Sequence, residues 1–191
     1  MAPLIRVLLV TGSTRRASSN SAALRTAIAV SPAGVETRLF DDLAGLPAFN
    51  PDDDHDPLPL SVARLREQIS WADGVLFCTP EYAGTLPGSF KNLLDWTVGG
   101  GQLYGKPVGW INVAAEGRGD GAITTLKLVL SYVSAHVVDG AVGRLPIRRD
   151  ALTVDGLVDD HEFRSGVVDI LEALSTHVDG AGREPREPAS A

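Results

Sequence analysis

Residues 12–20 (Gly-Ser-Thr-Arg-Arg-Ala-Ser-Ser-Asn) form a polar loop that could bind a charged ligand. The loop follows an apolar run and carries hydroxyls, one amide and two arginines. Such groups, with the free backbone amides of a helix start, suit a terminal phosphate dianion. The loop is neither a G-x-G-x-x-G fingerprint nor a Walker loop, because Ser18 takes the last glycine position and no Gly-Lys-Ser/Thr follows. Alternatively, Ser18 and Asn20 only cap the next helix while Arg15 and Arg16 are solvated.

A second loop begins at Thr79 and leads into an amphipathic segment that ends near Trp96. Pro80 and Pro87 fix the backbone at either end of a turn that contains glycine. This pattern favours a rigid platform whose backbone amides face a planar ligand, to which Tyr82 adds apolar area and a phenol.

The segment after this loop and a third loop carry weaker signals. Lys91 and Asp95 are four residues apart, so we expect them to pair on a helix. Trp96 is expected in the core or in a subunit interface rather than against a ligand. The third loop, residues 114–119, is followed by glycines that allow it to cover a ligand, but it lacks a dinucleotide fingerprint.

The elements that must position these loops alternate along the chain. Short apolar runs predict strands at residues 4–11, 74–79 and 107–113, and alternation predicts one at 35–40. A fifth strand is predicted at 136–139, with a continuation after Gly140 left open. Helical spacing of apolar residues predicts helices at 20–30, around 62–69, at 87–98, around 123–133 and at 160–177. Residues 41–60 are an acidic connection that contains prolines.

Strands that alternate with helices imply right-handed crossovers and a parallel sheet. We therefore predict an α/β fold: a doubly wound three-layer sandwich with a five-stranded parallel sheet in the flavodoxin-like order 2-1-3-4-5. One domain is expected over residues 1–178, followed by a flexible tail at 179–191. Ligands bind such sheets beyond the carboxyl ends of the strands, which would bring the loops after Thr11, Thr79 and Val113 together.

Composition limits the classes of function. The net charge of −7 over 191 residues argues against nucleic acid or an anionic membrane as the main partner. A single cysteine, Cys78, excludes an intrachain disulfide and favours a reducing compartment. No run approaches the ~20 apolar residues of a spanning helix, so we expect a cytoplasmic protein. The acidic run at residues 52–56 lacks the glycine and glutamate of an EF-hand, and no metal site is predicted.

The first two loops resemble those of the NADPH-dependent FMN reductase family, which includes flavin, quinone, azo-dye and chromate reductases. The family pattern G-S-x-R-x-x-S-x-N is matched by Gly12, Ser13, Arg15, Ser18 and Asn20. The pattern P-E-Y-N followed by P-G-x-x-K-N-x-x-D-W is matched by Pro80, Glu81, Tyr82, Pro87, Gly88, Lys91, Asn92, Asp95 and Trp96. Ala83 departs from the pattern, because the family usually has asparagine there.

The resemblance implies FMN as cofactor and NADPH or NADH as reductant. It places the FMN phosphate at residues 13–21, the ring against residues 80–83, and backbone amides of the third loop at the pyrimidine edge. The implied cofactor-binding residues are Ser13, Arg15, Ser18, Ser19, Asn20, Ser21, Pro80, Glu81, Tyr82, Ala83, Ala114 and Ala115. No catalytic side chain is assigned, because the cofactor carries the chemistry.

The implied activity is hydride transfer from NAD(P)H to FMN and then to an acceptor at the same face, in ping-pong order. The acceptor is a flavin, a quinone, an azo compound or a metal oxyanion, and the protein is expected to form a homodimer or tetramer. Two alternatives stay open: a flavodoxin-like electron carrier reduced by a partner, and an interaction protein without flavin. The arginines of the first loop favour the reductase over the carrier, whereas Ala83 gives the flavin-free alternative some support.

Overall fold

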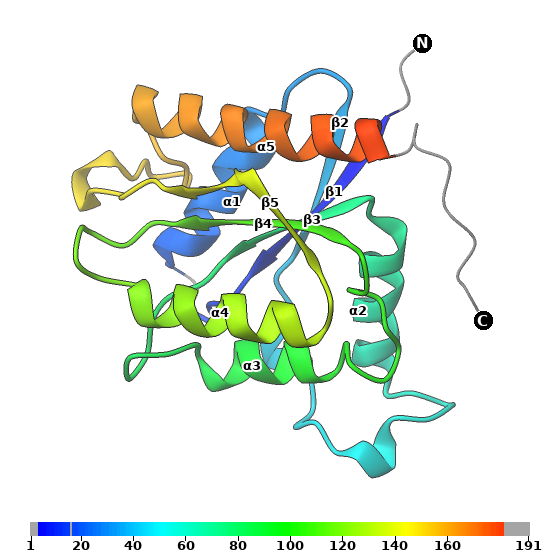
Figure 1. Ribbon diagram of the computed structural model, residues 1–191. Coiled ribbons are helices and arrows are strands. Elements are labelled where there is room, and N and C mark those ends of the chain that lie inside the picture. Colours follow the sequence, from blue (N-terminus) through cyan, green and yellow to red (C-terminus); the bar gives the residue numbers. More distant parts are fainter. Residues whose placement is uncertain (1–3, 16, 182–191) are drawn as a thin grey trace.

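Five strands form one parallel sheet in the order β2-β1-β3-β4-β5, which confirms the predicted topology. The structure is a computed structural model that describes residues 4–15 and 17–181 (Figure 1). Its strands are β1 (Ile5–Thr11), β2 (Val35–Phe40), β3 (Gly74–Cys78), β4 (Pro107–Asn112) and β5 (His136–Arg144). β1 and β3 lie inside the sheet and are almost wholly buried, as the continuous apolar runs in their sequences require.

Helices cover both faces of the sheet and complete a three-layer sandwich (Figure 1). They are α1 (Ser19–Ala29), α2 (Leu60–Trp71), α3 (Gly88–Asp95), α4 (Asp120–Tyr132) and α5 (His161–Ala181). Side chains alternate between the two faces along each strand. In β1, Leu8 and Val10 pack with α2, α3 and α4, whereas Val7 and Leu9 pack with α1 and α5. The sheet therefore separates two apolar clusters, and its two ends are left for loops.

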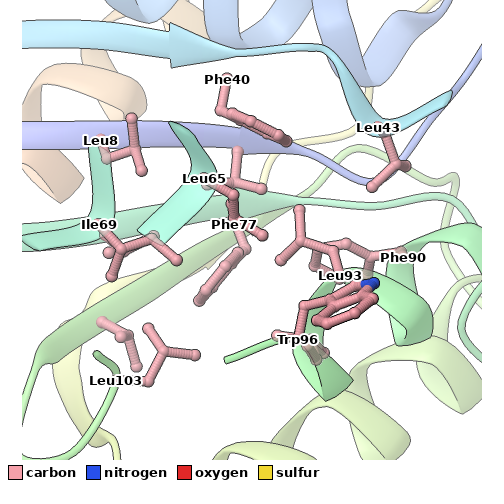
Figure 2. Close-up of a cluster of buried hydrophobic side chains, with 14 of the residues drawn as sticks. Leu8, Phe40, Leu43, Leu65, Ile69, Phe77, Phe90, Leu93, Trp96 and Leu103 are labelled. Atoms are coloured by element: carbon pink, nitrogen blue, oxygen red, sulfur yellow. The ribbon is translucent and has the colours of Figure 1, made fainter. Parts of the chain in front are cut away.

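Trp96 belongs to the core on the α2–α3–α4 face (Figure 2). Its side chain is 0% exposed, and its ring meets Phe49 edge-on at a centroid distance of 5.0 Å. The indole N–H donates to the Pro47 carbonyl at 2.9 Å, so this buried polar atom has a partner. Of the two expected positions for Trp96, the structure shows the core.

Several element boundaries differ from the predicted ones. α3 ends at Asp95 rather than at residue 98, because the chain turns where the Thr97 amide donates to the Leu94 carbonyl. The connection at residues 41–60 includes two short 3-10 turns. α5 continues to Ala181, so residues 179–181 of the predicted tail are helical, and residues 182–191 lie outside the described residues. The division into one domain and a tail stays a prediction.

β5 continues past Gly140 to Arg144, a continuation that the sequence left open, and it pairs irregularly with β4. Val108 is opposite Val137, but Trp110 is opposite Val142, so β5 carries extra residues between the two pairs. Gly109 lies at this irregularity, and a Cβ there would come within 2.2 Å of the Ala141 carbonyl oxygen. The irregular pairing brings Arg144 level with the end of β4, where Asn112 is its partner. Within the described part of the chain, no helix has the length and apolarity needed to cross a membrane.

Candidate functional site

The loops that follow β1, β3 and β4 border one cavity of about 440 Å³ at the carboxyl edge of the sheet. This is the place that the strand order predicts for a ligand. Five predicted residues line the cavity: Ser19, Asn20, Pro80, Glu81 and Ala114. Four further residues that the sequence did not assign also line it: Thr79, Val113, Arg118 and Gly119.

The first loop is ordered by buried hydroxyl groups that lie behind the cavity wall. The Thr11 hydroxyl is 3.2 Å from the Ser21 hydroxyl and accepts from the Ser13 amide at 3.3 Å. The Ser13 hydroxyl in turn accepts from the Arg15 amide at 3.3 Å. Ser13 and Ser21 are buried and are not among the residues that line the cavity. In this structure they shape the loop, and their predicted contact with a phosphate stays a prediction.

Gly12 sets how closely the first and second loops approach each other. Its amide donates to the Cys78 carbonyl at 2.8 Å. A Cβ at this position would lie 2.2 Å from the Thr79 hydroxyl oxygen, far inside contact distance. Only glycine therefore fits here without moving the loop that follows β3.

The start of α1 combines a helix cap with cavity-lining groups. The Ser18 hydroxyl accepts from the Asn20 amide at 3.2 Å, which confirms that Ser18 caps the helix. The Asn20 side-chain oxygen accepts from the Cys78 thiol at 3.3 Å. Burial raises the pKa of the Cys78 thiol, so the thiol keeps its proton and acts as the donor. The Asn20 oxygen is thereby engaged by the protein, which fixes the orientation of this cavity-lining amide.

Arg15 does not line the cavity. Its guanidinium donates to the Ala17 carbonyl at 2.6 Å, and the side chain is exposed. Arg16, the second arginine of this loop, lies outside the described residues. Because Arg15 does not line the cavity in this structure, its predicted contact with a phosphate stays a prediction.

The second loop makes a tight turn in which Ala83 has a backbone role. Tyr82 and Thr85 exchange backbone hydrogen bonds at 3.0 and 3.1 Å. Between them, Ala83 and Gly84 have φ angles of +50° and +77°. Positive φ at both central residues defines a type I′ turn, for which Asn-Gly is the preferred pair. Tyr82 is 52% exposed, and neither it nor Ala83 lines the cavity.

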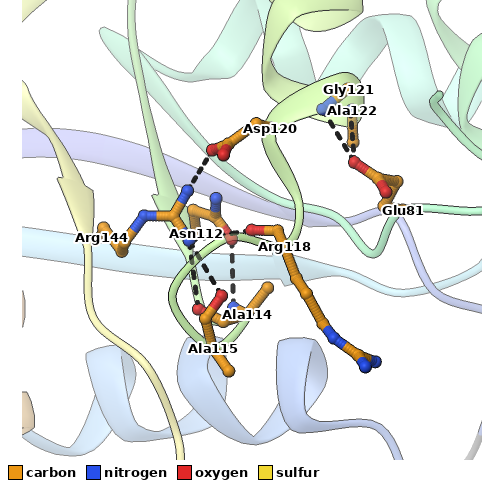
Figure 3. A network of polar contacts seen from close by, with 9 residues as sticks. All are labelled: Glu81, Asn112, Ala114, Ala115, Arg118, Asp120, Gly121, Ala122 and Arg144. Atoms are coloured by element: carbon orange, nitrogen blue, oxygen red, sulfur yellow. Dashed lines mark hydrogen bonds and ion pairs between the residues drawn. The ribbon is translucent and has the colours of Figure 1, made fainter. Parts of the chain in front are cut away.

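Glu81 connects this loop to α4 (Figure 3). One carboxylate oxygen accepts from the Gly121 amide at 2.8 Å and from the Ala122 amide at 3.2 Å. These amides belong to the first turn of α4, where a carboxylate satisfies free donors and is favoured by the helix dipole. The Thr85 and Thr125 hydroxyls, 2.9 Å apart, make a second link between the loop and α4. The sequence predicted a backbone contact to a ligand for Glu81 and gave no sign of this side-chain role.

The third loop is held by the guanidinium of Arg144 (Figure 3). It donates to the carbonyls of Ala114, Ala115 and Arg118 at 3.4, 3.2 and 2.8 Å, and it forms an ion pair with Asp120. Three carbonyls are thus drawn to one side of the loop. Sequence reasoning missed Arg144, because its position depends on the irregular pairing of β5.

The two amides predicted at the pyrimidine edge differ in availability. The Ala114 amide donates to the Asn112 side-chain oxygen at 3.0 Å and is therefore occupied. No described residue accepts from the Ala115 amide. Of the two predicted donors, only the Ala115 amide is unoccupied among the described residues, but Ala115 is not one of the residues that line the cavity.

The chain is similar to known proteins over most of its length. Residues 5–144 match the family described as NADPH-dependent FMN reductase. The chain is 33% identical over 177 residues to an NAD(P)H-dependent FMN reductase of Pseudomonas aeruginosa, covering 91% of this chain and 95% of that protein. It is 30% identical over 172 residues to a quinone reductase of Escherichia coli, covering 88% and 81%. Among solved structures it is similar to FerB, a flavoenzyme NAD(P)H:(acceptor) oxidoreductase from Paracoccus denitrificans, with a TM-score of 0.77, 27% identity, and coverage of 91% and 98%.

Proposed function

The chain belongs to the NADPH-dependent FMN reductase family, and we propose from this premise that it binds FMN in the cavity at the carboxyl edge of the sheet. With NAD(P)H as reductant, it is an oxidoreductase for small-molecule acceptors, of which quinones are the first class to test. The observation that carries the proposal is the meeting of both family-motif loops at one cavity. The relatives are named as reductases, which does not favour the electron-carrier or flavin-free alternatives.

The residues around the cavity fit FMN. Ser19 and Asn20 supply polar groups beside the start of α1, where backbone amides favour a phosphate. Pro80, Val113 and Ala114 supply apolar surface for a flat ring. The volume of about 440 Å³ lies within the roughly 300–1,000 Å³ usual for cofactor sites.

Each loop has a separate task in the proposed mechanism. FMN, when bound, supplies the hydride-accepting and electron-donating chemistry. The first loop holds the phosphate through the start of α1, for which Ser13, Ser18 and Ser21 keep the backbone in place, with Arg15 as a predicted further contact. The second loop offers residues 80–83 as a surface for the ring. Glu81 keeps that surface fixed against α4.

The third loop is proposed to contact the ring edge through the Ala115 amide, which Arg144 helps to orient. Because one cavity serves the site, we propose that reductant and acceptor enter the same opening in turn, as a ping-pong order requires. No protein acid or base is assigned.

The test is direct. The purified protein is titrated with FMN while flavin fluorescence is followed, and NADPH oxidation is then measured with a benzoquinone acceptor. Saturable FMN binding and quinone-dependent NADPH oxidation support the proposal, whereas no FMN binding at micromolar concentrations contradicts it. Anaerobic bleaching of the bound flavin by NADPH alone separates a reductase from an electron carrier, which needs a partner protein.

We further propose a cytoplasmic protein that assembles as a homodimer or tetramer and has neither nucleic acid nor membrane as partner. The charge of −7 and the buried free Cys78 support the location and the excluded partners. Tyr104 and Tyr132, 77% and 81% exposed, lie beside a second cavity at the amino edge of the sheet and support assembly with a second copy. Light scattering during size-exclusion chromatography tests the oligomeric state, and a monomer at micromolar concentration contradicts it.

A further inference from the structure

Arg118 brings a positive charge to the cavity from the third loop. Arg118 is exposed and lines the cavity together with Ser19 and Asn20, which belong to α1. Figure 3 shows the side chain leaving the Arg144 network and extending toward the blue ribbon of α1. Within the part of the chain that the structure describes, no group accepts a hydrogen bond from the Arg118 guanidinium, and no carboxylate forms an ion pair with it. Its donors are therefore available to an anionic ligand.

The backbone of Arg118 is held firmly although its side chain is not. Its carbonyl accepts from Arg144 at 2.8 Å, and its amide donates to the Ala115 carbonyl at 3.0 Å. Gly117 and Gly119 on either side have φ angles of +74° and +82°, which allow the chain to turn sharply here. A side chain that starts from a fixed backbone loses less freedom when it binds a ligand.

The charges around the cavity favour an anion near Arg118. Among the described residues that line the cavity, Arg118 alone carries a positive charge and Glu81 alone a negative one. The Glu81 carboxylate is already bound by two amides of α4. Arg15 is turned toward the Ala17 carbonyl instead. The cavity thus has one available guanidinium within a protein whose net charge is −7.

From these observations we propose that Arg118 binds the FMN phosphate from the wall opposite α1 and makes the site select FMN over riboflavin. The proposal rests on the proposed function, because it requires FMN in this cavity. A guanidinium contacts a phosphate through two parallel N–H donors, whereas riboflavin offers no phosphate to this arginine. Arg118 is accordingly a specificity-determining residue that the family motifs of the first two loops do not include.

The experiment measures the Kd of apo-protein for FMN and for riboflavin by quenching of flavin fluorescence. It compares the wild type with Arg118→Gln, Arg118→Lys and Arg15→Gln. Arg64→Gln is the charge-matched control, since Arg64 is exposed on α2. We expect Arg118→Gln to raise the Kd for FMN by about 10- to 100-fold, the range for a lost hydrogen bond to a charged group. The Kd for riboflavin should change less than about twofold, and Arg118→Lys should recover part of the FMN affinity.

Salt provides an independent readout. FMN affinity of the wild type should fall as NaCl is raised, and this dependence should be weaker in Arg118→Gln than in Arg64→Gln. Circular dichroism and thermal unfolding check the fold, which the substitution should leave intact because the Arg118 side chain has no described partner.

Three results would overturn the proposal. Equal losses of FMN and riboflavin affinity in Arg118→Gln would place the arginine at the ring. Loss of the FMN preference in Arg15→Gln but not in Arg118→Gln would return the phosphate contact to the first loop. A wild type that binds both flavins equally would remove the selectivity but leave the proposed function standing. A wild type that binds neither contradicts the proposed function itself.

Discussion

Ala83 has a backbone conformation that suits its side chain poorly. With φ of +50°, it takes the first central position of the turn closed by Tyr82 and Thr85. Left-handed backbone strains a residue that has a Cβ by roughly 1–2 kcal/mol, and asparagine tolerates it better. We therefore expect Ala83→Asn to raise the free energy of unfolding by about 0.5–1 kcal/mol, measured by urea denaturation.

Ala83→Val is the opposing variant, since a β-branched residue is least compatible with positive φ. It should lower the unfolding midpoint where asparagine raises it. Identical midpoints for all three proteins would mean that the turn does not keep this conformation in solution. The family's asparagine thus has a backbone explanation, which the sequence alone did not provide: it indicated only that a side-chain contact was missing.

Glu81 is expected to contribute to stability and to binding at once. Glu81→Ala removes the acceptor for the Gly121 and Ala122 amides and should lower the free energy of unfolding by about 1 kcal/mol. It should also weaken FMN binding, because residues 80–83 lose their link to α4. Glu81→Gln keeps an oxygen acceptor and should lose less of both. The measurements are urea denaturation and FMN titration, and an Ala variant with unchanged stability would contradict the capping role.

At the level of single residues, the sequence predicted local contacts better than distant ones. The capping role of Ser18 and the Lys91–Asp95 ion pair, 2.6 Å in the structure, follow from spacing within one helix or its start. The thiol of Cys78 donates to Asn20 across 58 positions of sequence. A contact of that kind depends on the packing of β3 against α1, which no local pattern encodes.

Between elements, the approach of the second loop to α4 depends on Gly121. A Cβ at this position would lie 2.1 Å from the Gly84 carbonyl oxygen and 3.0 Å from a Glu81 carboxylate oxygen. Because one neighbour is backbone, Gly121→Ala must push the loop away from the helix. We expect a loss of about 1–3 kcal/mol in stability together with weaker FMN binding.

Gly88→Ala is the matched control for this substitution. Gly88 lies in the first turn of α3, and a Cβ there would meet nothing within 4 Å. Alanine should leave stability unchanged or raise it slightly, because it restricts the unfolded chain and favours helix. Thermal unfolding and FMN titration of both variants test the prediction. A Gly121→Ala protein that behaves like Gly88→Ala would show that the loop and α4 are not tightly packed.

The order of elements was predictable, whereas the irregular pairing of β5 with β4 was not. Apolar periodicity gave each strand and helix, because burial on one or two faces of a sheet determines that pattern. The irregular pairing of β5 depends on the close approach of Gly109 and Ala141 in neighbouring strands. Arg144 reaches the third loop only through this register. For this reason, the sequence around Arg144 does not indicate that this residue orders the third loop.

Across the whole molecule, the two edges of the sheet have different tasks. The carboxyl edge carries the cavity, whereas the amino edge carries an ion pair that joins β1 to the start of β3. Arg6 donates to the Asp73 carboxylate through its backbone amide and two guanidinium nitrogens, at 2.9 to 3.1 Å. We therefore expect substitutions at the amino edge to change stability without changing cofactor binding.

Burial alone would raise the pKa of the Asp73 carboxyl. The hydrogen bonds and the positive charge of Arg6, together with the charge of Lys106, outweigh this effect, so the pKa of Asp73 lies below its usual 3.8. A carboxyl whose pKa is lowered by folding stabilises the native state above its unfolded pKa. That contribution is lost as the pH falls through the folded value. Asp73→Asn removes it, so its urea midpoint should be below that of the wild type at pH 7, with the difference shrinking below pH 4.

FMN affinity at pH 7 serves as the internal control for this prediction. It should be the same in Asp73→Asn and wild type, because the ion pair and the cavity lie at opposite edges of the sheet. Urea denaturation at pH 7, 5 and 3.5 measures the first effect, and flavin titration measures the second. A midpoint difference that stays constant with pH would mean that the Asp73 charge is not what stabilises the pair. Reduced FMN affinity would mean that the two edges are coupled through β1 and β3, the buried strands that connect them.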